Sequence, residues 1–366
     1  MAELPTIGGS IAEPPRPELE AVDAATRGSA LAGLIRWELL LLVLVVALIW
    51  AGGAVSPVFL SPNNFGNLVA AVMEVAIMSL PMALVVIIGE IDLSVESMAG
   101  LSAALLGFLF DAGVPLPVAI AACIGIGVLG GLFNGLLVTR AGLSSLVVTL
   151  GTLALYRGMA LIILGPRGIS GFPTEFTAFG FGRIPGTPIP WPFLVYFGLA
   201  VALGFMLHAT RTGRKLFAIG KNVGAAQYSG IHVQRIKLSL FILSGTVAAI
   251  AGVLLAARFA SARADLAQGM TLTVVTIVLL GGVNIFGGRG TILGVALAAL
   301  ALALLGNVLR LTNVSAEIQS ISVGALLIVS VLVPNLARWV GNLFERARRG
   351  PPARAGPGDE GAIASD

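Results

Sequence analysis

Residues 83–101 read ALVVIIGEIDLSVESMAGL, and the fold depends on how the chain accommodates this stretch. Apolar residues lead into it and a second apolar run leads out of it, yet Glu90, Asp92 and Glu96 stand between them. An ionised carboxylate inside a membrane span costs on the order of 2.5–3.5 kcal/mol on insertion scales. It persists where it faces a water-filled path, finds a partner or lies at the end of a span.

The composition around this stretch is that of a helical membrane protein. Of the 366 residues, 57% are hydrophobic and 11% are charged, whereas about 25% of residues are charged in an average globular domain. Several apolar stretches approach or exceed the roughly 18 residues that indicate a membrane span. The expected fold class is therefore all-α, a polytopic membrane protein with about ten transmembrane helices, some of them short or broken.

Ten apolar spans are expected between two polar tails. The third and the eighth are short for a full crossing, which needs about 20 residues. The expected limits of the spans are 37–55, 66–89, 97–111, 116–138, 145–164, 193–209, 238–257, 271–285, 291–310 and 318–336.

These spans form one transmembrane domain, residues 36–340, and the charges predict its orientation. Residues 1–35 are polar and broken by prolines, which predicts a disordered tail, and residues 341–366 are predicted to be first basic and then disordered. Sixteen of the 22 Lys and Arg residues fall on the side of the N-terminus, five fall on the other side, and Arg157 lies within a span. Because cytoplasmic loops carry the excess of Lys and Arg, both termini are expected in the cytoplasm.

Two of the connecting loops are long. Residues 166–192 are expected outside, and their glycine, proline and aromatic content suits a partly ordered lid or docking surface. Residues 208–237 are expected inside, with basic ends and a middle, NVGAAQYSG, that is predicted to form a short helix. The alternative for this second loop is a solvated basic segment that contacts anionic membrane lipid.

The opening stretch predicts a break within the membrane. Gly89 frees the backbone, a new helix restarts at Leu93 or Val95, and Asp92 or Ser94 is its N-cap. The alternative is that the carboxylates only mark the cytoplasmic end of the second span. Broken helices are tolerated where they line a cavity or are buried in protein, and the short third span fits such a break.

A similar break is predicted in IVLLGGVNIFGGRG, residues 277–290, where Asn284 takes the place of Asp92. In the first break, Glu96 is expected to favour the positive end of the restarted helix. The predicted helix-break residues are Gly89, Glu90, Asp92, Ser94 and Asn284.

Several polar residues within other spans have two interpretations each, whereas the glycines have one. Glu74, roughly one to two turns inside the outer end of the second span, is either an interfacial carboxylate or a group of the substrate path. The hydroxyls of Thr149 and Thr152 either bond their own helix or line a hydrophilic path. Glycines at four-residue spacing in the fourth span, Gly127 and Gly131 among them, predict close helix packing.

The sequence argues against several other functions. Cys123 lies in an apolar run, His208 and His232 lie in the basic loop, and no spacing typical of a metal site exists among them. No GxxxxGK[ST] loop is present, so no ATP site is expected on this chain. The net charge of +4 is interpreted as topology, not as nucleic-acid binding. We expect no metal, no cofactor, no catalytic residues and no nucleic-acid partner.

Four stretches together resemble one protein family, and the resemblance extends over residues 36–340. They are GEIDLSV, FNGLLVTRAGLSSLVVTLGTLALYRG, GRKLFAIGKNVGAAQYSGIHVQRIK and LGGVNIFGGRGTILG, and they resemble the permease subunits of bacterial monosaccharide ATP-binding cassette (ABC) importers. Where the family more often has glycine, this chain has Glu90 and Glu96. The form with Glu90 looks most like rhamnose permeases, and FASARADL, residues 259–266, looks like rhamnose and autoinducer-2 permeases.

The resemblance implies a permease of the bacterial inner membrane that conducts a monosaccharide inward and hydrolyses no ATP itself. Rhamnose is favoured, and ribose or another pentose or hexose is possible. The implied partners are an ATPase subunit with two nucleotide domains, a periplasmic sugar-binding protein and a second permease, identical or not. The implied ATPase-coupling residues lie in the loop 208–237 and are Gly220, Asn222, Ala225, Ala226 and Gly230.

The substrate path is expected to carry hydroxyls and amides, because the binding protein supplies specificity. The candidate residues are Glu74, Asp92, Asn134, Thr149 and Thr152. Three alternatives stay open: an autoinducer-2 permease, a branched-chain amino acid permease, and a proton-coupled secondary transporter that uses Glu74 or Asp92 as its proton site.

Overall fold

The structure is a computed structural model, and it describes residues 37–330 and 332. The expected tails 1–35 and 341–366, and the end of the tenth expected span, lie outside the described residues. The helices are Trp37–Val55, α2 (Pro62–Ile87), α3 (Val95–Asp111), α4 (Leu116–Thr139), α5 (Ser145–Leu164), α6 (Thr174–Phe181), α7 (Pro192–Ala209), α8 (Arg211–Lys221), α9 (Val223–Tyr228), α10 (Val233–Phe259), α11 (Met270–Leu280), α12 (Ile292–Leu311) and Ala316–Ser330.

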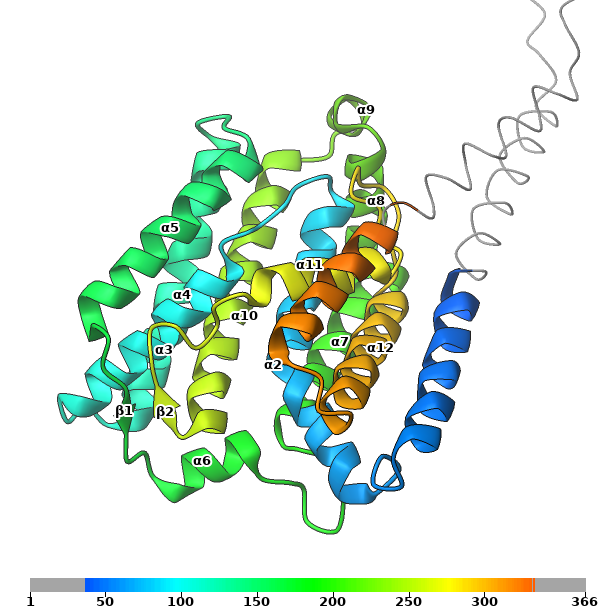
Figure 1. Ribbon diagram of the computed structural model, residues 1–366. Helices are drawn as coiled ribbons and strands as arrows, with labels where there is room; N and C mark the ends of the chain where they lie inside the picture. Colours follow the sequence, from blue (N-terminus) through cyan, green and yellow to red (C-terminus); the bar gives the residue numbers. More distant parts are fainter. Residues whose placement is uncertain (1–36, 331, 333–366) are drawn as a thin grey trace, which may run out of the picture.

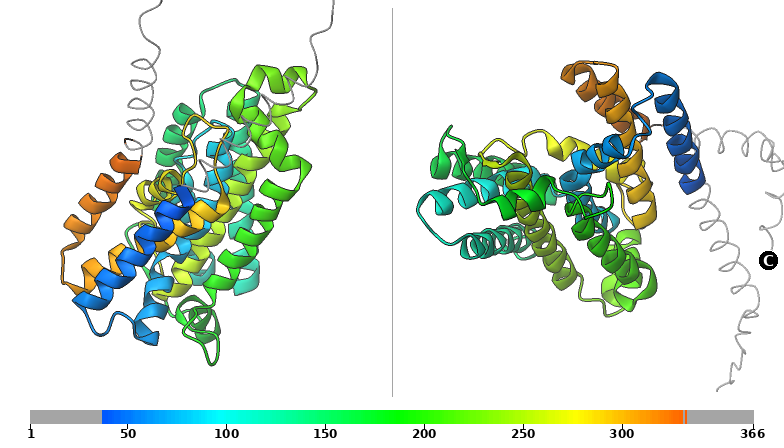
Figure 2. Two further views of the ribbon diagram at one scale, coloured as in Figure 1. Left: turned by 90° about the vertical axis from the view of Figure 1, so that its right-hand side faces the viewer. Right: turned by 90° about the horizontal axis from the view of Figure 1, so that it is seen from below.

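The architecture confirms a polytopic all-α membrane protein (Figure 1). Among the described residues, seven helices are long and apolar enough to cross a membrane. They are Trp37–Val55, α2, α4, α5, α7, α10 and α12, and the shorter apolar helices α11 and Ala316–Ser330 accompany them. Helix α2 and helix α10 form the centre, where most of their residues are buried, and Trp37–Val55 stands at the margin (Figures 1 and 2).

Helix α11 is too short to cross the membrane by itself. Its 11 residues extend about 16 Å at 1.5 Å per residue, roughly half of the hydrocarbon thickness. The helix ends at Leu280 and a turn follows, so the expected span 271–285 is interrupted within the stretch 277–290, where the sequence predicted a break. The non-helical segment 263–269 precedes α11 in the chain.

Helix α3 has a related form, because the non-helical segment 88–94 precedes it and it begins only at Val95. In Figure 1 this segment runs from the end of α2 toward the middle of the bundle, where α3 begins. The chain thus contains two crossings in which an irregular segment is followed by a helix.

Small residues allow α4 and α10 to approach closely, as the glycine spacing predicted. A Cβ added to Gly131 would lie 2.3 Å from the carbonyl oxygen of Phe241, and one added to Gly127 would lie 2.6 Å from that of Gly245. Both distances are far shorter than van der Waals contact, so only glycine fits at these positions.

The two ends of the bundle are built differently. One end carries α6 and the short antiparallel pair of β1 (Ile169–Ser170) and β2 (Ser261–Ala262), both contributed by connecting loops. The other end carries α8 and α9 (Figure 1). The middle of the loop 208–237 therefore forms the short helix that the sequence predicted, α9.

Candidate functional site

The first break begins where α2 ends. Gly89 has φ +81°, a conformation that favours glycine, and its N–H donates to the carbonyl of Val86 at 2.9 Å. The N–H of Glu90 donates to the carbonyl of Val85 at 3.1 Å. This pair of bonds around a left-handed glycine is the usual way to satisfy the last carbonyls of a helix.

Asp92 is buried and accepts three hydrogen bonds. Its Oδ1 accepts from the backbone N–H of Ser94 at 3.0 Å and from the Ser94 hydroxyl at 2.6 Å. Its Oδ2 accepts from the hydroxyl of Ser244 on α10 at 2.7 Å. Asp92 therefore stabilises the turn before α3. Ser94 holds the N-cap position of α3, one of the two positions that the sequence predicted, although its side chain makes no cap bond.

The polar network continues from Ser94 into α4 and α5. The amide of Asn134 donates to the Ser94 hydroxyl at 2.8 Å, and the Tyr156 hydroxyl lies 3.2 Å from the Asn134 carbonyl oxygen. Tyr156 also donates to the carbonyl of Gly130 at 2.9 Å. The network thus joins the break to α4, α5 and α10. Sequence reasoning singled out neither Tyr156, which lies in the quoted stretch 133–158, nor Ser244, which lies in an apolar helix outside the quoted stretches.

The two glutamates of the opening stretch have separate partners. Glu90 forms an ion pair with Lys237 near the start of α10. Glu96 accepts a hydrogen bond from the backbone N–H of Thr271 at 2.8 Å. Thr271 lies in the first turn of α11. Glu96 therefore caps the N-terminus of α11, whereas the sequence analysis expected Glu96 to stabilise the N-terminus of α3, the helix to which it belongs.

The second break has nearly the same local structure as the first. Gly282 has φ +81°, and its N–H donates to the carbonyl of Leu279 at 3.0 Å. The Oδ1 of Asn284 accepts from the N–H of Phe286, two residues on, at 3.0 Å. Asp92 accepts from the residue two positions on in the same way. The breaks also touch, since the N–H of Gly288 donates to the carbonyl of Ile87 at 2.8 Å.

The five candidate path residues are all buried in the single chain. The hydroxyl of Thr149 donates to the carbonyl of Ser145 at 2.8 Å, and that of Thr152 donates to the carbonyl of Val148 at 3.1 Å. Asp92 and Asn134 belong to one network through Ser94. These four residues gather between the first break, α4 and α5.

Glu74 lies apart from the other candidates and pairs with Arg258 near the end of α10. Its Oε1 is 2.9 Å from the Nε of Arg258, but the two groups are not aligned as a hydrogen bond. The attraction is therefore mainly electrostatic. Glu74 is buried within the chain, and Arg258 is the last residue but one of α10.

The candidate coupling residues lie on α8, on α9 and in the turns beside α9. A Cβ on Gly220 would lie 1.9 Å from the carbonyl oxygen of Ile87 and 2.3 Å from the nitrogen of Gly288, so α8 packs directly on both breaks. The side chain of Asn222 caps α9 by accepting from the N–H of Ala225 at 3.0 Å. Ala225 is exposed, whereas Ala226 is buried.

The end of α9 presents an exposed aromatic side chain. Gly230 follows the helix with φ +77°, and nothing lies within 4 Å of the place where its Cβ would stand. Tyr228, which the sequence did not single out, is 97% exposed. An exposed aromatic ring on a short projecting helix is typical of a contact with another protein.

Comparison with known proteins shows that the sequence of this chain is similar to those of transport permeases. Residues 64–331 match the family described as branched-chain amino acid transport system / permease component. The chain is 38% identical over 325 residues to the autoinducer 2 import system permease protein LsrD of Enterobacter sp. (strain 638), covering 86% of this chain and 98% of the relative. It is 39% identical over 302 residues to LsrD of Salmonella paratyphi A, covering 81% and 90%. No solved structure matches the chain.

Proposed function

Because the chain belongs to the branched-chain amino acid transport system / permease component family, as an ABC importer permease of the ribose and autoinducer-2 type, we propose that it carries autoinducer-2 across the inner membrane. The observation that carries this proposal is the similarity to LsrD over 98% of the relative's length. The sequence favoured rhamnose on the form GEIDLS, but the relatives described above are autoinducer-2 permeases. Autoinducer-2 is therefore better supported than rhamnose or ribose.

The energy for import comes from a partner, in this proposal an ATPase subunit that docks on α9. Tyr228 supplies an exposed aromatic anchor, and α8 connects α9 to both helix breaks through Gly220. A displacement of α9 by the ATPase is thereby passed to Ile87 and Gly288, where the two breaks meet. The other partners are a second permease subunit and a periplasmic binding protein that delivers the substrate.

The orientation follows from this docking. The end with α8 and α9 faces the cytoplasm, where the ATPase resides, and the end with α6 and the β1–β2 pair faces the periplasm. The excess of Lys and Arg on the side of α8 and α9 supports the same orientation.

Uptake measurements test the substrate. Cells without an autoinducer-2 importer would receive this permease with its ATPase, second permease and binding protein, and uptake of autoinducer-2, rhamnose, ribose and leucine would be compared. Uptake of autoinducer-2 that exceeds the others is the expected result. Preferential uptake of rhamnose, ribose or leucine would overturn the substrate assignment.

The energy source needs a separate measurement. In vesicles, import that needs ATP and persists with an uncoupler supports the ABC mechanism. Import that stops with the uncoupler while ATP is present would instead indicate a proton-coupled transporter with Glu74 or Asp92 as its proton site.

A further inference from the structure

The non-helical segment 263–269 carries exposed polar residues and precedes α11, a helix too short to cross a membrane by itself. It connects β2 at one end of the bundle to the start of α11, about halfway along the bundle (Figure 1). Arg263, Asp265, Gln268 and Gly269 are all exposed in this segment. Hydrocarbon cannot satisfy irregular backbone, so such segments occur at membrane depth only where protein buries them or where they line water.

Helix α5 contributes an exposed charge to the same region. Arg157 lies 12 residues after α5 begins at Ser145, or about 18 Å along the helix, well inside a membrane span. Among the described residues its guanidinium has no ion-pair partner within 4 Å. An unpaired arginine at this depth is costly against lipid.

Segment 263–269 and Arg157 meet at one small hollow. Its lining residues are Glu96, Ser97, Arg157, Ala264, Asp265 and Gln268. The volume is about 20 Å³, space for roughly one water molecule. In the single chain this hollow is therefore too small to enclose a ligand. Its lining residues form a partly exposed surface, which is called the wall below.

The charges in this wall are balanced. Asp265 is paired with Arg263, whose Nε lies 2.9 Å from Oδ1, and Glu96 already caps α11 through Thr271. Two acids and two arginines, counting Arg157, leave no net charge. A neutral ligand rich in hydroxyls fits such a set of donors and acceptors better than an ion does.

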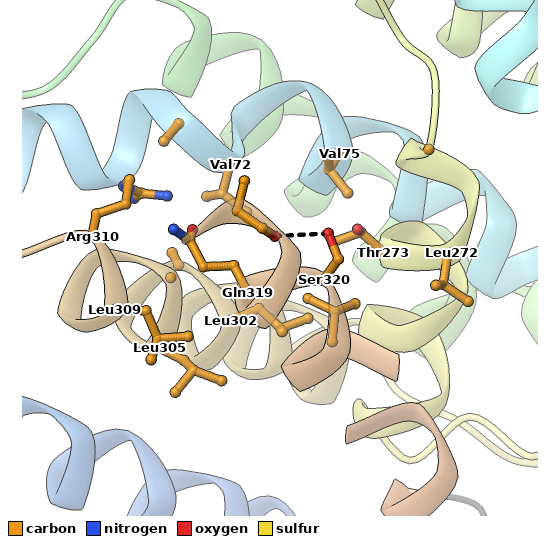
Figure 3. A pocket seen from close by; sticks show the side chains of 16 residues that line it. Val72, Val75, Leu272, Thr273, Leu302, Leu305, Leu309, Arg310, Gln319 and Ser320 are labelled. Atoms are coloured by element: carbon orange, nitrogen blue, oxygen red, sulfur yellow. Dashed lines mark hydrogen bonds between the residues drawn. The ribbon is translucent and has the colours of Figure 1, made fainter. Parts of the chain in front are cut away.

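The wall continues beyond Gln268 into a larger hollow. Gly269, the next residue, lines a cavity of about 390 Å³ between α2, α11, α12 and the helix Ala316–Ser330. Arg310, Gln319, Ser320 and Thr273 place polar groups around it (Figure 3). The views in Figures 1 and 2 show segment 263–269 and the helix Ala316–Ser330 on the same side of the bundle.

We propose that this side of the molecule, from Arg157 through segment 263–269 to the larger hollow, lines the aqueous translocation path, and that Arg157 and Gln268 contact the hydroxyl groups of the passing substrate at mid-depth. The contact with hydroxyls rests on the proposed function, whereas the exposure to water does not. The buried network of Asp92, Ser94 and Asn134 then supports the wall from behind.

Cysteine labelling tests the exposure to water. In a background with Cys123→Ala, Gln268→Cys and the control Ile162→Cys are made in the complete transporter in membrane vesicles. Ile162 is an 85% exposed residue of α5, the helix that carries Arg157, and its apolar side chain suits lipid. A small charged thiol reagent is expected to react with Cys at position 268 and not at 162. Protection at 268 with and without ATP, or equal reaction at both positions, would overturn the proposal whatever the substrate is.

Substitution of Arg157 tests the contact with substrate. If Arg157 faced lipid, Arg157→Leu would raise thermal stability and leave uptake unchanged. If it faces the path, Arg157→Leu is expected to raise the KM for autoinducer-2 roughly tenfold, as for the loss of one charge-assisted hydrogen bond, while Arg157→Lys retains part of the affinity. Unchanged KM in Arg157→Leu, or a loss confined to the amount of folded protein, would contradict the contact.

Discussion

The carboxylate of Glu96, in the first turn of α3, accepts a hydrogen bond from the backbone N–H of Thr271, in the first turn of α11, at 2.8 Å. The Thr271 hydroxyl returns a bond to the carbonyl of Leu93 at 3.3 Å. The two helices that follow irregular segments therefore begin beside each other. Because the first N–H groups of a helix have no partner within it, each start must be satisfied by another part of the fold.

Removing this cap is expected to destabilise the protein. Glu96→Ala leaves the Thr271 N–H without its acceptor, and the loss of a cap costs about 0.5–2 kcal/mol. Glu96→Gln keeps an oxygen acceptor and is expected to melt close to the unmodified protein. Thermal unfolding of the three purified proteins measures the effect, and an alanine variant as stable as the other two would show that the bond contributes nothing.

The Asp92 carboxylate is expected to act through hydrogen bonds and not through its charge. In Asp92→Asn the amide oxygen still accepts from the Ser94 N–H, and the amide nitrogen can donate to the Ser244 hydroxyl. Asp92→Leu leaves both serines without this partner, and each unsatisfied buried group costs about 1–3 kcal/mol. We therefore expect the Asn variant to keep much of its uptake and the Leu variant to lose both uptake and stability. A stably folded but inactive Asn variant would indicate a proton site instead.

Two glycines of α4 provide a matched pair for close packing. In Gly131→Ala the new methyl group meets the backbone of α10 at 2.3 Å, whereas Gly125 has nothing within 4 Å. Overpacking costs typically about 1–3 kcal/mol, and Gly→Ala in an open helix position gains up to about 1 kcal/mol. The melting temperature should fall for Gly131→Ala and stay or rise for Gly125→Ala. A shift of the same size and sign in both variants would contradict the packing of α4 on α10.

Docking of the ATPase on α9 is tested with Tyr228→Ala. Loss of a central aromatic anchor typically costs about 2 kcal/mol or more of binding energy, so less ATPase should co-purify. Phe181→Ala is the control, since Phe181 is a 57% exposed aromatic residue at the opposite end of the bundle. Substitution of Gly230 is a poorer test because of its positive φ. Full ATPase recovery with Tyr228→Ala would remove α9 from the docking surface.

The orientation is tested by labelling the two ends of the bundle. In the Cys123→Ala background, Ala141→Cys lies in the exposed turn between α4 and α5, and Thr187→Cys lies in the exposed loop between α6 and α7. An impermeant thiol reagent is expected to label position 187 in right-side-out vesicles and position 141 only in inside-out vesicles. The reverse pattern would invert the topology.

The sequence by itself determined the properties that act locally. Apolar length fixed the places of the long helices, from Trp37–Val55 to α12. Gly89 marked the first break, and the glycine-containing stretch 277–290 marked the second without placing the end of α11 at Leu280, because a positive φ such as those of Gly89 and Gly282 is cheap only for glycine. The four-residue spacing of glycines in α4 indicated close packing, since it places the small residues on one helix face.

Only the tertiary structure decided which polar groups meet. Asp92 finds Ser244 at a separation of 152 residues, Glu96 finds Thr271 at 175, and Glu90 finds Lys237 at 147. Nothing in the local pattern distinguishes these partners from the other serines, threonines and lysines of the chain. A buried polar group is stable only with a partner, and which partner is within reach depends on how α3, α10 and α11 pack around one another.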